Sequence, residues 1–234
     1  PIENTLSGAM SETYDAMLSS AVSIVGEEKF LLDHSLIGAK NATLGSIKKI
    51  FCSPHAVTEC SHFLAQHPSV KVEYLTDSAM SVKKIKEDGD PSQAAIASEE
   101  AARQFGLEVL KPGLSNQHDN YNRYLVLSRN PRKVDLRIPS KTSLVMSTAQ
   151  KAGALVEALL VFREHGINLT KLESRPIPNN PWEEMFYVDF EGNAESEKSK
   201  TVLNELIKHT RFIKVLGCYP SYDLAQTEPP AGLH

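Results

Sequence analysis

A polar cluster leads into an apolar run near the middle of the chain, in the stretch HDNYNRYLVLSRN (118–130). Asn120, Asn122 and Arg123 come directly before the apolar residues 124–127, which are typical of a buried strand. A guanidinium can bind a carboxylate through two hydrogen bonds, and amides can orient a polar ligand. The cluster therefore indicates an anion-binding site at the start of this strand. The alternative is that Arg123 is a solvated residue at a strand edge.

Alternating strand and helix patterns surround this cluster in residues 1–128. A first helix is expected from Ser7, with Met10, Tyr14, Met17 and Leu18 on one face. The expected strands are 48–53, 70–76, 93–98 and a strand from Tyr124. The other expected helices follow the N-caps Ser53, Ser78 and Ser98. The last of these helices ends at Gly106. This alternation predicts a largely parallel α/β sheet. Ligands of such sheets bind at strand carboxyl ends and helix N-termini, so Ser7 and Gly8 either face an anion or only cap the helix.

Residues 129–141 carry charges and two prolines without periodicity, and we interpret them as a linker. The patterns in 142–220 follow the order βαββαβ, which is ferredoxin-like. In its third strand Phe186, Val188 and Phe190 alternate with other residues, which predicts one buried face. A helix near 195–209 is expected to turn Val202, Leu206 and Ile207 inward. Residues 221–234 are a polar tail.

The bulk composition is that of an ordinary globular protein. The chain has 234 residues, of which 41% are hydrophobic and 23% charged. The net charge, 25 minus 29, is −4 and gives no reason to expect nucleic acid binding. The sequence shows no run of about 18 apolar residues, so no membrane partner is expected. Cys52, Cys60 and Cys218 lack metal-site or disulfide spacing and fit a reducing cytoplasm.

Two sets of motifs resemble a known family. Residues 1–8 (PIENTLSG), 53–60 (SPHAVTEC), 94–98 (AAIAS) and 120–127 (NYNRYLVL) are similar to the prephenate dehydratase domain. The stretch 152–193, with Gly153-Ala154-Leu155 and Glu173-Ser174-Arg175-Pro176, resembles an ACT regulatory domain of the phenylalanine-sensing type, as does KVLGCYPS (214–221). The combination is most similar to the proteobacterial enzymes that also carry a chorismate mutase domain.

The resemblance implies an architecture in four parts. A two-lobed α/β catalytic domain, like a periplasmic binding protein, is expected in 1–128, followed by the linker 129–141, the ACT domain 142–220 and the tail 221–234. The chain starts without Met inside a recognisable motif, so we expect it to be a piece of a longer polypeptide. The mutase domain and the first part of the dehydratase domain are expected to be absent from it.

The resemblance also implies a reaction, the loss of CO₂ and water from prephenate to give phenylpyruvate, with no metal or other cofactor. Arg123 would then hold a substrate carboxylate and Asn4 would orient the substrate, while Glu3 would form hydrogen bonds or exchange protons. Further substrate contacts are expected from Ser7, His55 and Ser78. For Glu3 and Asn4 the alternative is a loop with a turn, and for Ser78 it is a helix cap.

Asn122 departs from the family pattern. The family has Asn-x-Thr-Arg-Phe here, and its threonine is the group usually assigned as proton donor, whereas this chain reads Asn-Tyr-Asn-Arg-Tyr (120–124). An amide can donate a hydrogen bond but does not readily give up a proton. Three hypotheses follow: a dehydratase in which Asn122 polarises the leaving group, a phenylalanine-sensing module without activity, and a dehydratase of arogenate.

The second motif set implies an effector site. Phenylalanine would be bound by Gly153, Ala154 and Leu155 together with Glu173, Ser174, Arg175 and Pro176, across the interface of a homodimer or higher oligomer. Gly153 would allow close approach of backbone to the ligand. The alternative is that Gly153 only ends a turn and that the domain merely dimerises.

Overall fold

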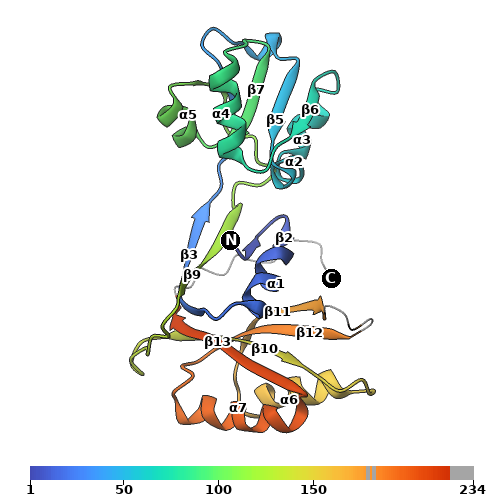
Figure 1. The fold of residues 1–234 in the computed structure, drawn as a ribbon, viewed down its shortest axis with the longest axis vertical. Coiled ribbons are helices and arrows are strands. Elements are labelled where there is room, and N and C mark those ends of the chain that lie inside the picture. Colours follow the sequence, from blue (N-terminus) through green and yellow to red (C-terminus); the bar gives the residue numbers. More distant parts are fainter. Residues whose placement is uncertain (178–179, 181–182, 222–234) are drawn as a thin grey trace. The chain divides into compact units, whose positions relative to one another are not determined.

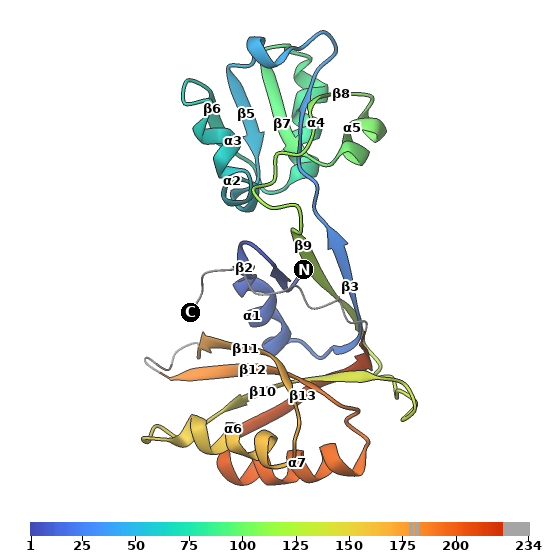
Figure 2. The ribbon, with the colours of Figure 1, turned by 180° about the vertical axis from the view of Figure 1, so that it is seen from behind.

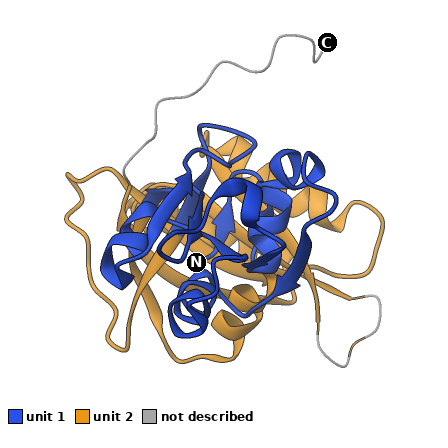
Figure 3. Ribbon diagram, turned by 90° about the horizontal axis from the view of Figure 1, so that it is seen from above, with its two compact units in different colours: residues 1–10, 29–123 blue, residues 11–28, 124–234 orange. Residues whose placement is uncertain are grey.

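The computed structural model describes residues 1–177, 180 and 183–221, so the predicted tail lies outside the described residues except for Ser221. Contacts divide the chain into two compact units, coloured separately in Figure 3. The first comprises Pro1–Met10 and Lys29–Arg123, and the second comprises Ser11–Glu28 and Tyr124–His234. Strands β3 (Ser23–Leu31) and β9 (Tyr121–Ser128) cross the unit boundaries. Both units are therefore discontinuous in sequence.

The first unit is built on a mixed five-stranded sheet with the order β6-β5-β7-β4-β8. Its strands are β4 (Ser35–Gly38), β5 (Lys49–Cys52), β6 (Lys71–Tyr74), β7 (Gln93–Ala97) and β8 (Glu108–Lys111). Strand β5 is parallel to β6 and β7, but β4 is antiparallel to β7 and β8. Because β8 is antiparallel to β4, it runs in the same direction as β7, so the predicted largely parallel sheet is correct for four of these five strands and wrong for β4. Strands β4 and β8 are absent from the predicted strands, whereas β5 and β6, which are equally short, were predicted.

Helices cover both faces of this sheet, as Figure 1 shows. They are α2 (Pro54–Glu59), α3 (Ser61–Ala65), α4 (Ser78–Asp88) and α5 (Glu99–Phe105), and a 3₁₀ turn spans Leu44–Ser46. Alternate residues of β7 supply two cores: Ala94 and Ile96 pack with the α2 and α3 side, and Ala95 and Ala97 with the α4 and α5 side. This alternation explains why β7 is a continuous apolar run in the sequence.

Two of the predicted helix caps are confirmed and one is wrong. Ser53 and Ser98 accept hydrogen bonds from Ala56 N and Ala101 N, as N-caps do. Helix α4, however, is capped by Asp77, whose carboxylate accepts from Met80 N at 2.7 Å, and Ser78 is its first helical residue. An extended aspartate directly before the helix satisfies the first amides, so Ser78 has no capping role there.

The first predicted helix also begins later than expected. Helix α1 spans Ser11–Ser19, and the short strand β2 (Gly8–Ala9) separates it from Ser7. Strand β2 pairs with β1 (Glu3–Asn4), so the backbone around Ser7 forms a turn between two strands. The predicted helix start at Ser7 is therefore wrong, and Ser7 does not cap α1.

The second unit contains the predicted order βαββαβ. Its elements are β10 (Ser140–Ser147), α6 (Ala154–Glu164), β11 (Leu169–Pro176), β12 (Glu184–Glu191), α7 (Glu197–His209) and β13 (Phe212–Pro220). The strands follow the order β11-β12-β10-β13 with antiparallel pairing, and α6 and α7 lie on one face (Figure 2). Phe162, Phe190 and Leu206 lie in the core between the helices and the sheet.

The opposite face of this sheet is also covered, which corrects the prediction of one buried face for β12. Tyr187 and Asp189 are buried as well as Val188 and Phe190. The ring of Tyr14, from α1, meets the Tyr187 ring edge-on at 4.8 Å, and Tyr187 Oη donates to the Tyr14 carbonyl at 2.8 Å. Because α1 lies far from β12 in the sequence, periodicity within β12 does not reveal this cover.

One predicted core residue of α7 points outward. Val202 and Leu206 are fully buried, whereas Ile207 is 58% exposed. Residues four apart in a helix share a face, and the next residue lies about 100° around the axis. The prediction that Ile207 faces inward is therefore wrong.

Strand β13 meets β3 in parallel at a close approach between Gly217 and Ile24. A Cβ atom built on Gly217 would lie 2.1 Å from the carbonyl oxygen of Ile24. Only glycine fits at such a distance, because the neighbouring atom belongs to the backbone and does not rotate away.

Candidate active site

Two short strand segments bring the predicted catalytic residues together. In the pairing of β1 with β9, Glu3 lies opposite Arg123 and Asn4 lies opposite Asn122. Successive side chains of a strand point to opposite faces, and paired residues share a face. Asn4 and Asn122 therefore lie on one face of this ribbon, and Glu3 and Arg123 on the other.

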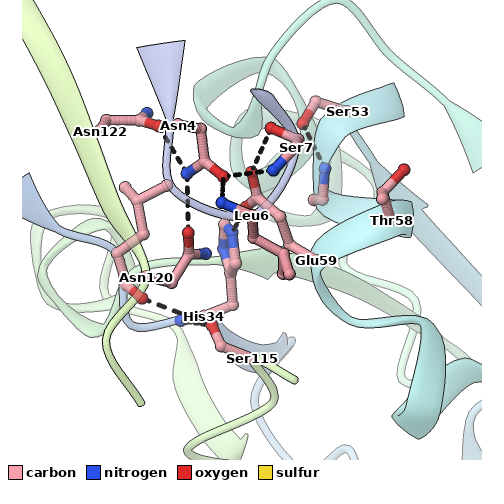
Figure 4. A network of polar contacts seen from close by, with 12 residues as sticks. Asn4, Leu6, Ser7, His34, Ser53, Thr58, Glu59, Ser115, Asn120 and Asn122 are labelled. Carbon is pink, nitrogen blue, oxygen red and sulfur yellow. Dashed lines mark hydrogen bonds and ion pairs between the residues drawn. The ribbon is translucent and has the colours of Figure 1, made fainter. Parts of the chain in front are cut away.

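Asn4 is the centre of a buried hydrogen-bond network (Figure 4). Its Nδ2 donates to Asn120 Oδ1 at 2.7 Å and to Asn122 Oδ1 at 2.8 Å. Its Oδ1 accepts from the backbone amides of Leu6 at 2.8 Å and Ser7 at 2.7 Å. Both hydrogens and both lone pairs of the amide are therefore used, so Asn4 holds the turn and the two other asparagines in place.

The network continues from Ser7 to a buried pair of a glutamate and a histidine. Ser7 Oγ donates to Glu59 Oε1 at 3.3 Å, and Glu59 Oε2 lies 2.5 Å from His34 Nε2. The side chains of Glu59 and His34 are 2% and 11% exposed. Glu59 ends α2, and His34 stands directly before β4. Burial is the main cause that raises the pKa of the neighbouring Cys60 thiol to about 12, and the nearby Glu59 carboxylate is the second.

Arg123 is buried on the other face of the ribbon. Its Nη1 donates to Glu3 Oε1 at 2.8 Å, and the two side chains are 9% and 24% exposed. A guanidinium has five N–H donors, so this bond does not by itself prevent Arg123 from binding a substrate carboxylate. Strand alternation alone could have indicated that Arg123 and Asn122 point to opposite faces of the ribbon.

His55 and Ser78 are not part of this network within the described residues. His55 is exposed in the first turn of α2, and Ser78 is half-buried in the first turn of α4. No hydrogen bond in the described part of the chain joins either side chain to Asn4, Ser7 or Glu59. Their predicted contacts with substrate remain predictions.

The sequence interpretation missed Glu59 and His34. Glu59 falls four residues after His55, in a helix whose buried side was identified from its apolar residues alone. His34 precedes the buried pair Leu36 and Ile37, as Arg123 precedes its own apolar run. A polar residue at the start of a buried strand was therefore the available signal for His34.

The predicted effector residues lie in two separate segments of the second unit. Gly153 has a left-handed φ of 81° and is the N-cap of α6. Residues 148–156, including Ala154 and Leu155, line a cavity of about 430 Å³. A second cavity, of about 210 Å³, is lined by residues of the segments 147–150, 177 and 183–186. Residues 173–176 line neither cavity, so one chain does not bring the two predicted segments together there.

Arg175, one of the predicted effector ligands, is bound within its own chain. Its Nε and Nη2 donate to the two carboxylate oxygens of Asp15 at 3.2 and 2.8 Å. This hydrogen bonding raises the pKa of Arg175. Glu173 forms a longer ion pair with Lys171, at 3.6 Å. A carboxylate ligand at Arg175 would therefore have to compete with or join Asp15.

The described residues contain no cluster of three or more potential metal ligands. None of the helices that they form is long and apolar enough to span a membrane.

Known proteins with a similar sequence or structure indicate the family to which this chain is related. The prephenate dehydratase family model matches residues 1–132. The bifunctional chorismate mutase/prephenate dehydratase of Escherichia coli K12 is 43% identical over 229 residues, which is 98% of this chain and 59% of that protein. The chain thus spans less than two thirds of such relatives.

Among solved structures, prephenate dehydratase from Arthrobacter aurescens in complex with L-Phe superposes with a TM-score of 0.84 at 28% identity, covering 94% of this chain and 74% of that one. GqqA, described as a quorum quenching acylase, superposes with a TM-score of 0.81 at 27% identity, covering 94% of this chain and 80% of that one. A shared fold can host different activities, so function must be argued from the site. The family model, which matches more than half of the chain, shows that the chain belongs to the prephenate dehydratase family.

Proposed function

We propose that the protein is a prephenate dehydratase that converts prephenate to phenylpyruvate, CO₂ and water in phenylalanine biosynthesis in the cytoplasm. The observation that carries this proposal is the Asn4-centred network, which joins the PIEN motif to the start of β9. These are the two segments on which the family resemblance rests. A bound substrate on this face would be oriented by fixed amides and a hydroxyl.

The proposed reaction needs three kinds of group. A cation must hold a carboxylate, polar groups must orient the ring, and a proton must reach the departing oxygen. We assign the first role to Arg123, with Glu3 as its partner; because these two side chains lie on the other face of the ribbon from Asn122, the substrate would have to reach around the edge of the ribbon to be held by both. Asn122 and Ser7 contact the substrate, while Asn4 fixes both of them, and His55 and Ser78 are the more peripheral candidates.

We further propose the domain division 1–128, 129–141, 142–220 and 221–234, with a two-lobed catalytic domain and a ferredoxin-like ACT domain. The strand order β11-β12-β10-β13, with two helices on one face, supports the second assignment. Phenylalanine would bind between residues 153–155 of one protomer and residues 173–176 of another. Within one chain residues 173–176 do not line the cavity formed by residues 148–156, which supports a site that a homodimer completes.

The experiment that tests the function compares substrates and effector in the full-length protein. We expect prephenate to be converted faster than arogenate, and phenylalanine to suppress the rate. Phenylpyruvate and phenylalanine formed are measured with each substrate, and phenylalanine binding is measured by calorimetry. Phenylalanine binding without turnover of either substrate would favour the sensing module. Faster conversion of arogenate than of prephenate would identify arogenate as the substrate.

A further inference from the structure

Dehydration requires a proton at the leaving oxygen, and Asn122 does not readily supply one. The hydroxyl that lies next in the same network is Ser7 Oγ. The backbone amide of Ser7 and the side chain of Asn122 are both bound by the single amide of Asn4. Ser7 is half-buried, whereas Glu59 behind it is almost completely enclosed. The serine therefore links the enclosed carboxyl group to the Asn4 network that also holds Asn122.

We propose that Glu59 and Ser7 form the proton relay of this enzyme, with His34 as the positioning residue of the carboxyl group. This inference rests on the proposed function and adds the source of the proton. Glu59 Oε1 faces Ser7 Oγ at 3.3 Å, and Oε2 is held by His34 Nε2 at 2.5 Å. The two oxygens of the carboxyl group thus have separate tasks.

The relay transfers one proton from Glu59 through Ser7 to the leaving group. In the proposed reactive state the pair is neutral: His34 Nε2–H donates to Glu59 Oε2, and the hydrogen bond between Ser7 and Glu59 is reversed, so that the carboxyl proton on Oε1 is donated to Ser7 Oγ and the serine O–H turns to the substrate. As the C–O bond of the substrate breaks, the Ser7 O–H proton passes to the departing hydroxide and forms water. The Glu59 proton replaces it on Oγ, while the electrons of the breaking C–CO₂⁻ bond enter the ring and CO₂ leaves. Glu59 ends as a carboxylate, which the His34 N–H stabilises.

The structure offers a simpler role for the same pair, which the test must separate. His34 and Glu59 also tie the end of α2 to the segment before β4, and a buried polar pair of this kind can be purely structural. A structural role would lower stability and alter both kcat and KM. A relay affects kcat and its dependence on solvent protons.

The decisive variants are Glu59→Gln and Ser7→Ala in the full-length protein, assayed with prephenate. Gln is isosteric with Glu but carries no transferable proton. We expect each variant to lower kcat by about 10²- to 10⁴-fold with KM within about threefold of the wild type. The wild type should show a normal solvent deuterium isotope effect on kcat, which Glu59→Gln should abolish. Glu205→Gln is the matched control, since Glu205 also pairs with a histidine, His165 at 2.6 Å, but in the other unit.

A double-mutant cycle completes the test. A hydroxyl at position 122 should make the relay dispensable, so Glu59→Gln should cost less than about threefold in an Asn122→Thr background. The relay is wrong if the wild type turns over prephenate and Glu59→Gln and Ser7→Ala keep kcat within twofold of it. It is also wrong if Asn122→Thr does not relieve the effect of Glu59→Gln. A wild type without turnover would instead contradict the proposed function itself.

Discussion

Replacing Gly217 by alanine is expected to destabilise the protein by about 3 kcal/mol or more. The added Cβ would lie 2.1 Å from the Ile24 carbonyl oxygen and 2.8 Å from both the carbonyl carbon and the nitrogen of Ile24. These are backbone atoms of β3, so relief requires β13 and β3 to separate and lose their pairing. The free energy of unfolding is measured by urea denaturation, followed by circular dichroism.

Gly45→Ala is the control for this prediction. A Cβ at Gly45 meets no atom within 4 Å, and the residue has no left-handed φ. We expect Gly45→Ala to change the free energy of unfolding by less than about 0.5 kcal/mol. Equal stabilities of the two variants would contradict the close approach of β13 to β3.

Replacing Asn4 by alanine is expected to lower both stability and activity strongly. The change removes four hydrogen bonds and leaves the buried oxygens of Asn120 and Asn122 without this donor. A buried polar group that loses its partner costs about 1–3 kcal/mol, so a loss of about 3–5 kcal/mol is expected. Because the turn that carries Ser7 is also released, kcat/KM for prephenate should fall at least about 10²-fold.

Asn130→Ala provides the comparison, because Asn130 is exposed and lies after β9. We expect it to match the wild type in urea denaturation and in kcat/KM. An Asn4→Ala variant that kept wild-type kcat/KM would show that the network does not position the catalytic groups.

Much of the fold could be predicted from local sequence patterns. Ser53 with Pro54 and Ser98 with Gly106 carry their own start and stop signals, and the structure has helices there. Strands β4 and β8 were not predicted because, unlike β5 and β6 of the same length, neither is followed directly by a helix start signal. The burial of Tyr187 depends on Tyr14, which lies in a distant part of the sequence. Local patterns contain no information about such a contact.

The candidate site was predictable only in part, for a related reason. The motif residues Asn4 and Asn122 were identified, and the structure joins them directly. His34 and Glu59 are each an ordinary polar residue in the sequence, and only the folded chain brings Nε2 to 2.5 Å from Oε2. In contrast, the sequence could have shown that Asn122 and Arg123 point to opposite faces, because successive side chains of a strand alternate.

The central claim is that this chain dehydrates prephenate with its own polar network although position 122 is an asparagine. The most direct measurement is kcat for phenylpyruvate formation from prephenate by the full-length wild type and by its Asn122→Thr variant. We predict clear turnover by the wild type and an increase of less than about tenfold on introducing threonine, since a proton donor is already present. A wild type without turnover, with or without rescue by threonine, would contradict the claim.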